Sequence, residues 1–154
     1  KEITPTDPEG DGNPSARHSH SLTYDAARGV VVMFGGSFYT DNEGELCPDG
    51  QTAGGALGTF CALSDVWEYD GVSWEEVVPI DPEGDGDPWG RQQHSLTYDI
   101  SRSVVVLFGG FSGASGYYLY DTWEYDGVSW KKITHSLNCF GCNPVIESED
   151  RYWN

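Results

Sequence analysis

Apolar and polar residues alternate along several short stretches of the chain, and the whole pattern occurs twice. HSLTYD stands at 20–25 and again at 94–99, and its alternation is typical of a strand with one buried face. Each copy continues through a turn into a run of branched apolar residues, VVVMF at 30–34 and VVVLF at 104–108. Such a run is typical of a strand that is buried on both faces. The pattern predicts strands and no helix.

Two further strand-like pieces complete each copy. DVWEYD at 65–70 and DTWEYD at 121–126 alternate again, and each ends in an Asp-Gly pair, a strong signal for a two-residue hairpin turn. SWEEVV and SWKKIT, which follow at 73–78 and 129–134, predict a short outer strand with charged side chains toward water. Each copy therefore predicts four antiparallel strands.

The spacing of the copies locates one insertion. One and the same spacing separates the two HSLTYD stretches, the two FGG triplets at Phe34 and Phe108, and the two DPEGDG segments at Asp7 and Asp81. The WEYDG motifs at Trp67 and Trp123 lie closer together than that. The difference places an insertion in the first copy, between its FGG triplet and its WEYDG motif, within 37–63.

The order Arg-x-x-His, Tyr-Asp, VVVLFGG, DTWEYDG and Trp resembles the kelch repeat, and most closely the bacterial kelch or galactose-oxidase type of β-propeller. The resemblance covers about Arg17 to Thr134. It implies an all-β fold in which each copy is one blade of four antiparallel strands. Closed propellers have about 4–8 blades. We therefore expect a fragment of a larger propeller, completed by further blades of the same chain or of other chains.

The repeat divides the chain into four parts. We expect the end of a preceding blade and an acidic loop at 1–16, and blade one at 17–80 with its insertion at 37–63. An acidic loop and blade two follow at 81–134, and a loop and the start of a third blade at 135–154, where RYWN is similar to RQQH at 91–94. All long connections are expected at the edge opposite the short turns, where loops on a rigid scaffold often bind ligands. The alternative is that they only cover the rim.

The net charge of the chain limits the classes of partner that it can bind. The chain has 25 acidic and 8 basic residues and a net charge of −17. A nucleic-acid-binding surface needs clustered basic residues, so we expect no nucleic acid. An anionic membrane surface would repel the chain, and no apolar run is long enough to enter a membrane. Divalent cations and cationic proteins are the natural partners of such a charge.

Four cysteines, Cys47, Cys61, Cys139 and Cys142, suggest two disulfides in a secreted or extracellular protein. We expect Cys47 to pair with Cys61 across the insertion, and Cys139 with Cys142. Pairing of Cys47 or Cys61 with the CFGC motif on the neighbouring blade is the alternative. Reduced thiols and a metal half-site at CFGC are further interpretations.

The two DPEGDG segments place carboxylates at positions 1, 3 and 5 and Gly at position 6, as in a calcium-binding EF-hand loop. We therefore expect Ca²⁺ at Asp7, Glu9 and Asp11, and at Asp81, Glu83 and Asp85 with Asp87 as an additional ligand. The bidentate Glu of position 12 is absent, because His18 and Gln92 stand there. A neighbouring loop must supply that ligand, or the segments are solvated acidic turns.

We predict a non-catalytic extracellular propeller segment that is a binding or structural scaffold for protein or glycan partners. Arg17, Arg91 and the repeated His, Tyr and Trp residues are expected to be structural, because a catalytic residue is usually needed once. One alternative is part of a propeller enzyme, either a copper enzyme like galactose oxidase or a carbohydrate-active one. Another is a two-blade subunit that assembles with its copies into a ring or fibre.

Overall fold

The computed structural model describes residues 4–8, 10–40, 47, 53–55, 58–112 and 117–133. Every regular element in these residues is a β-strand, and all strand pairs are antiparallel, which confirms the expected all-β class. The strands are β1 (Ser21–Asp25), β2 (Val30–Phe34), β3 (Ser37–Thr40), β4 (Ala53–Gly55), β5 (Gly58–Ala62), β6 (Val66–Tyr69), β7 (Trp74–Val77), β8 (Ser95–Asp99), β9 (Val104–Ser112), β10 (Tyr117–Tyr125) and β11 (Trp130–Ile133). In these residues we find no helix of the length and apolar character that crossing a membrane requires.

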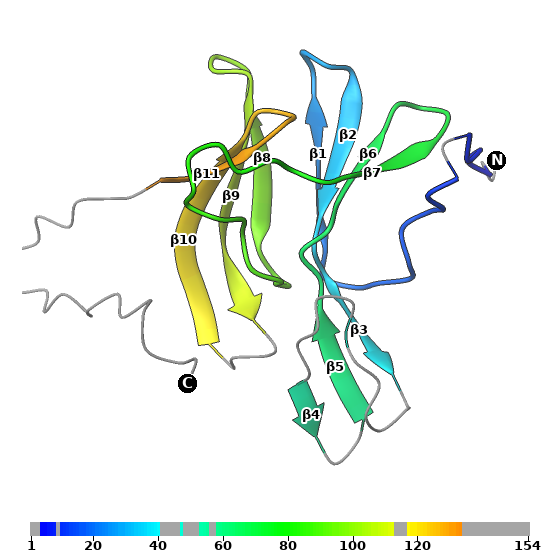
Figure 1. Cartoon of the computed structure of the whole chain (residues 1–154), viewed down its shortest axis with the longest axis vertical. Coiled ribbons are helices and arrows are strands. Elements are labelled where there is room, and N and C mark those ends of the chain that lie inside the picture. Colours follow the sequence, from blue (N-terminus) through cyan, green and yellow to red (C-terminus); the bar gives the residue numbers. More distant parts are fainter. Residues whose placement is uncertain are drawn as a thin grey trace, which may run out of the picture.

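The two copies fold into two four-stranded sheets with the same connectivity. Sheet one has the strand order β1-β2-β6-β7, and sheet two has the order β8-β9-β10-β11. The pairing registers agree as well, since Tyr69 faces Trp74 in sheet one and Tyr125 faces Trp130 in sheet two. The sheets stand next to each other with β1 beside β8 (Figure 1).

The Asp-Gly pairs form a longer turn than the sequence predicts. The segment 70–73 connects Tyr69 to its partner Trp74, so the two-residue hairpin is wrong. The reason is that Asp70 Oδ1 accepts hydrogen bonds from the main-chain N–H groups of Val72 and Ser73, at 2.7 and 2.9 Å. Asp126 does the same in sheet two. A side-chain cap of this kind supports a wider turn.

The insertion in the first copy forms a sheet of its own. β3, β5 and β4 make a three-stranded sheet in the order β3-β5-β4, below called the inserted sheet. It extends beyond the ends of β2 and β6, on the side away from the short turns (Figure 1). Sheet two has a shorter arm at the same place, where Phe111 of β9 pairs with Tyr118 of β10. The insertion therefore lengthens an arm that both copies have.

One hydrophobic core joins the two four-stranded sheets. It consists of Val32, Phe34 and Val66 from sheet one and Val105, Leu107, Trp123, Tyr125 and Trp130 from sheet two. The Phe34 ring packs edge-on against Trp130, with 5.3 Å between ring centroids. Burial of this apolar surface holds the sheets together.

Candidate functional site

The contact between the two sheets is built on the segment Arg91–His94, below called the docking segment. It precedes β8 of sheet two and lies against sheet one. Gly36 N donates a hydrogen bond to Arg91 O at 2.9 Å, and Arg91 N donates to Leu63 O at 3.1 Å. The main chain of this segment therefore adds hydrogen bonds to the end of sheet one.

Two further hydrogen bonds complete the docking. Gln93 N donates to Ser19 O at 2.9 Å, and the Ser21 hydroxyl donates to His94 O at 2.7 Å. Gly35 is required beneath the segment, because a Cβ there would lie 2.7 Å from Arg91 O. Its φ of 62° is also a conformation that L side chains rarely adopt.

The side chain of Arg91 stays within its own sheet. Its guanidinium binds both carboxylate oxygens of Asp121, at 2.5 and 2.9 Å, and also donates to Gly109 O. The Trp123 indole N–H donates to the same carboxylate at 2.7 Å. Burial raises the pKa of Asp121, but Arg91 and Trp123 outweigh burial and hold it below its ordinary value.

Sheet one repeats this arrangement atom for atom. The Arg17 guanidinium binds both oxygens of Asp65, at 2.6 and 2.8 Å, and donates to Gly35 O, while the Trp67 indole donates to Asp65. Two partly buried bidentate pairs at equivalent positions indicate a structural role for both arginines. The sequence signalled Arg17 and Arg91 but not their acidic partners.

His94 is a buried titratable group at the centre of this contact. Its ring packs edge-on against Phe34, with 5.4 Å between centroids. Neither ring nitrogen has a hydrogen-bond partner of acceptable geometry among the described residues. Burial and the positive charge of Arg91 lower the pKa of His94 from 6.5 to about 4. The neutral imidazole is therefore the form that fits the folded protein.

A second contact between the sheets lies near the short turns, where a cation–π contact and a hydrogen bond join the ion pairs of sheet one to a tyrosine of sheet two. Arg28 binds Asp25 at 2.7 Å and Glu68 at 2.5 Å within sheet one, and its guanidinium lies 5.4 Å from the ring centroid of Tyr125 in sheet two. The Tyr125 hydroxyl donates to Glu68 at 3.0 Å. Burial and the Glu68 carboxylate raise the pKa of Tyr125. Side chains of both sheets therefore take part in this contact, namely Arg28 and Glu68 of sheet one and Tyr125 of sheet two.

The outward faces of the pair carry the same residues without a cover. Phe34 is 0% exposed because sheet two covers it, whereas the equivalent Phe108 is 56% exposed on the outer face of sheet two. On the opposite face, Leu22 and Tyr24 of sheet one are exposed, while the equivalent Leu96 and Tyr98 are partly buried between the sheets. Sequence-equivalent residues thus differ in burial according to their neighbour.

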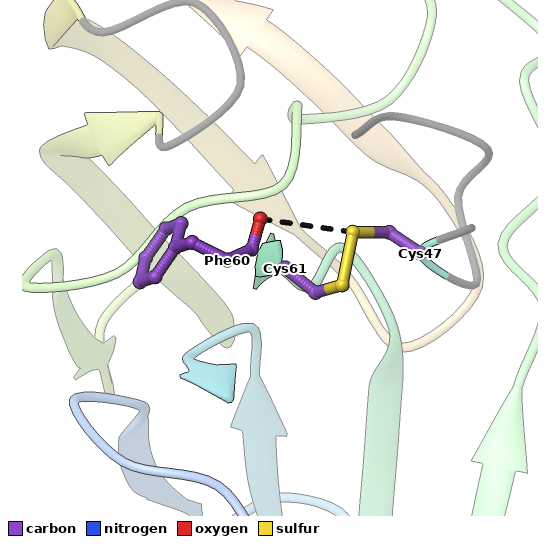
Figure 2. Close-up of a disulfide and its surroundings, with 3 residues drawn as sticks. All are labelled: Cys47, Phe60 and Cys61. Atoms are coloured by element: carbon purple, nitrogen blue, oxygen red, sulfur yellow. Dashed lines mark hydrogen bonds between the residues drawn. A yellow bond between two sulfur atoms is a disulfide. The ribbon is translucent and has the colours of Figure 1, made fainter. Parts of the chain in front are cut away.

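The inserted sheet is held by a disulfide. Cys47 and Cys61 are joined, with their Cα atoms 5.3 Å apart and both residues buried. Cys47 Sγ lies 3.7 Å from the carbonyl oxygen of Phe60, and Figure 2 marks this contact with a dashed line. This is a packing contact and not a hydrogen bond, because a disulfide sulfur has no proton to donate. The crosslink fixes Cys47 to β5.

Exposed aromatic residues lie on the inserted sheet and on β10, the strand that contributes to the arm of sheet two. Tyr39 on the inserted sheet is 67% exposed and lies between His18 and Phe60, at 5.9 and 5.3 Å between ring centroids. Tyr118 and Tyr120 on β10 are 79% and 72% exposed. These three tyrosines are below called the edge tyrosines. The repeat did not reveal them, because none of them has an aromatic counterpart in the other copy.

The two acidic DPEGDG segments, at 7–12 and 81–86, lie along the outer strands of the two sheets. Thr6 bridges Ser73 and Ile80 bridges Ser129, so each segment runs beside the outer strand of the sheet that it precedes. Asp11 accepts a hydrogen bond from Glu76 N at 2.7 Å, and Asp85 accepts one from Lys132 N at 2.8 Å. The carboxylates thus cap the edges of β7 and β11, which otherwise could pair with other strands.

The predicted calcium ligands serve as main-chain caps in this structure. Asp7 accepts a hydrogen bond from Gly10 N, and Asp81 accepts bonds from the N–H groups of Gly84, Asp85 and Gly86. The described part of the chain contains no group of three His, Cys, Asp or Glu residues placed to hold a metal ion. Burial and the carboxylates of Asp81 and Asp85 raise the pKa of Asp87. Calcium binding stays a prediction.

Three of the expected site residues, Glu9, Cys139 and Cys142, lie outside the described residues, as do the predicted start of a third blade at 151–154 and residues 1–3.

Comparison with known proteins adds one distant relative. No protein-family model matches the chain. The chain is 27% identical over 133 residues to Mei4-dependent protein 6 of Schizosaccharomyces pombe, an alignment that covers 78% of this chain and 17% of that protein. The chain thus spans less than a fifth of the length of the relative. The name of that protein states no ligand or reaction.

Proposed function

We propose that the chain is a pair of consecutive blades of a kelch-type β-propeller, and that it is a secreted, non-catalytic scaffold for a protein or glycan partner. The observation that carries the proposal is the equivalence of the two sheets. Each has four antiparallel strands, one bidentate Arg–Asp pair beside its first strand and a face that packs on the other sheet in one shared core. Radial repetition of such sheets is the architecture of a propeller.

The edge tyrosines support a binding role. Large exposed aromatic side chains on a rigid scaffold are typical of interfaces, because they bury much area at little entropic cost. The disulfide beside Tyr39 and Phe60 stiffens the inserted sheet, which lowers the cost of ordering it on binding. A disulfide is also typical of proteins in oxidising compartments, which supports secretion. The net charge of −17 favours a partner with a basic surface.

The test is a binding screen of the immobilised chain against a glycan array and a panel of purified basic secreted proteins. The matched variants are the triple change Tyr39→Ala, Tyr118→Ala and Tyr120→Ala, and Ile100→Ala as a control on an exposed residue in the β8–β9 turn at the opposite edge. Loss of anchoring aromatic residues typically costs more than about 1 kcal/mol, so we expect at least a roughly fivefold weaker interaction for the triple variant alone. No bound ligand of either class, or equal binding by the triple variant, contradicts the proposal.

A further inference from the structure

A hollow of about 270 Å³ opens on the outer face of sheet two. Gln93, Ser95, Phe108, Gly110 and Leu119 are among the residues that line it. Each of these residues has an equivalent at the matching place of the repeat in sheet one. In the same order, the equivalents are Ser19, Ser21, Phe34, Gly36 and Leu63. The equivalent place on sheet one is occupied.

All five equivalents contact the docking segment Arg91–His94. Ser19 O and Leu63 O accept hydrogen bonds from its main chain, and Gly36 N and the Ser21 hydroxyl donate to its carbonyl groups. Phe34 packs against the His94 ring. The structure therefore shows the type of ligand that such a hollow takes, namely a segment with the pattern Arg-x-x-His whose third residue, Gln93, has a φ of 57°, as the equivalent Ser19 also has.

This chain carries a second segment of that pattern at Arg17–His20. It stands before β1 as the docking segment stands before β8, and Arg17 is held by Asp65 as Arg91 is held by Asp121. Within the chain, Arg17–His20 belongs to sheet one, whose outer face is open at Leu22 and Tyr24. The two halves of a sheet-to-sheet contact are thus present on opposite faces of one molecule.

We propose that the hollow on sheet two binds the Arg17–His20 segment of a second copy of this chain, so that sheet one of that copy covers sheet two. The inference rests on the proposed function in taking the sheets as consecutive blades, and it adds the partner and its docking site. Such a head-to-tail contact is heterologous, so it continues until a ring closes or a filament grows.

The surrounding side chains fit the same contact. The Phe34–Trp130 pair predicts that Phe108 packs on Trp74 of the second copy, which is only partly buried here. The contacts of Tyr125 with Arg28 and Glu68 predict that Tyr69 of the second copy meets Arg102 and Glu124. Arg102 already binds Asp99 and Glu124 as Arg28 binds Asp25 and Glu68. The receiving face therefore has its ionic groups in place.

The net charge of the chain determines how the salt concentration affects this association. Two molecules with a net charge of −17 repel each other, and salt screens that repulsion. The docking contacts themselves are main-chain hydrogen bonds and aromatic packing, which salt weakens little. Association is therefore expected to strengthen as the salt concentration rises, which is the reverse of the salt effect on contacts between opposite charges.

The test measures mass by light scattering of the full chain over about a hundredfold range of concentration, which spans about 2.7 kcal/mol of association free energy. Phe108→Asp and Ser95→Arg block the hollow at exposed positions, and Leu22→Asp blocks the opposite face. Val72→Asp is the matched control, since Val72 is equally exposed but lies in the β6–β7 turn. Circular dichroism checks that each variant is folded.

We expect the mass of the unmodified chain and of Val72→Asp to rise from 16.9 kDa to at least twice that value, and to rise further with salt. Phe108→Asp, Ser95→Arg and Leu22→Asp alone are expected to stay monomeric. A mixture of Phe108→Asp with Leu22→Asp should form dimers, because each variant keeps the face that the other lacks. A mixture of Phe108→Asp with Ser95→Arg should not.

A monomeric unmodified chain at high salt, unchanged association of the hollow variants, or no dimer in the complementary mixture overturns the inference. Folding failure of Phe108→Asp leaves Ser95→Arg to decide. Tyr118 also lines the hollow, so the proposed function is judged separately by a variant that changes only Tyr39→Ala and Tyr120→Ala in the binding screen. A monomeric chain that binds a ligand through the edge tyrosines would refute the second copy and keep the binding scaffold.

Discussion

The buried imidazole of His94 should make the stability of the protein depend on pH in a defined direction. The pKa of His94 is lowered from 6.5 to about 4 in the folded protein, by burial and by Arg91, with His20 as a further positive neighbour when it is charged. The unfolded chain therefore binds a proton more readily than the folded one between these values. Stability contributed by the neutral ring is fully present above about pH 6.5 and is lost as the pH falls toward 4.

The size of the effect follows from the shift. Each unit of pKa difference is worth about 1.4 kcal/mol, so the full shift corresponds to about 3 kcal/mol. Between about pH 7 and about pH 5 the expected loss from this group alone is about 2 kcal/mol. Asp121 and Asp25 have lowered pKa values, so their stabilisation is lost only at more acidic pH. The raised pKa values of Glu76 and Asp87 act in the opposite direction.

The assay is urea unfolding followed by Trp fluorescence at a series of pH values. His94→Gln removes the titrating group and should flatten the curve of unfolding free energy between about pH 7 and about pH 5 by about 2 kcal/mol relative to the unmodified chain. Leu96→Ala is the control, because it weakens the same contact and keeps His94, so its slope should persist. Equal slopes for His94→Gln and the unmodified chain would refute the assignment of the buried neutral ring.

Further predictions concern the sheet contact, the inserted sheet and calcium. Gly127→Ala should lower stability more than Gly71→Ala in thermal unfolding, because both glycines have φ near 100° but only a Cβ at 127 would lie 2.7 Å from Arg28; equal losses would contradict this contact. Cys47→Ser should weaken the inserted sheet by about 3 kcal/mol, seen as faster amide exchange in β5 with little change in β9; unchanged exchange in β5 would count against the crosslink. Calcium at about a hundredfold excess over its dissociation constant should add about 2.7 kcal/mol to stability, and an unfolding temperature that EDTA leaves unchanged would argue against it.

The strand pattern was predictable from the sequence, because the branched apolar runs and the alternating stretches have few other solutions. Burial was less so. VVVLF suggested a strand buried on both faces, yet in β9 Val105 and Leu107 are buried while Phe108 is exposed. Phe34, in the same motif, is fully covered. The difference lies in the neighbouring sheet, which no local pattern can specify.

The inserted sheet was hidden for a compositional reason. Its strands include Ala53–Gly55 and Gly58–Ala62, which are rich in small residues and have none of the alternation that marks a strand. The acidic segments were expected at the ligand-binding edge with other long connections, but they cap the outer strands through main-chain hydrogen bonds. Asp65 and Asp121 could have been found, since each stands two residues before the Trp of the WEYDG motif in its copy. Their distance in sequence from Arg17 and Arg91 concealed the pairing.

Equivalent residues of the two repeats differ in burial because different neighbours cover them. Fluorine NMR of the chain labelled with fluorophenylalanine tests it directly, through the solvent isotope shift of Phe34 and Phe108, which Phe→Leu variants assign among the six phenylalanines. Phe34 should show no shift between H₂O and D₂O at any protein concentration, because sheet two covers it. Phe108 should show a clear shift in dilute protein and lose it as a second molecule covers sheet two. A solvent-shifted Phe34, or a Phe108 that is shielded in the monomer, would contradict the account.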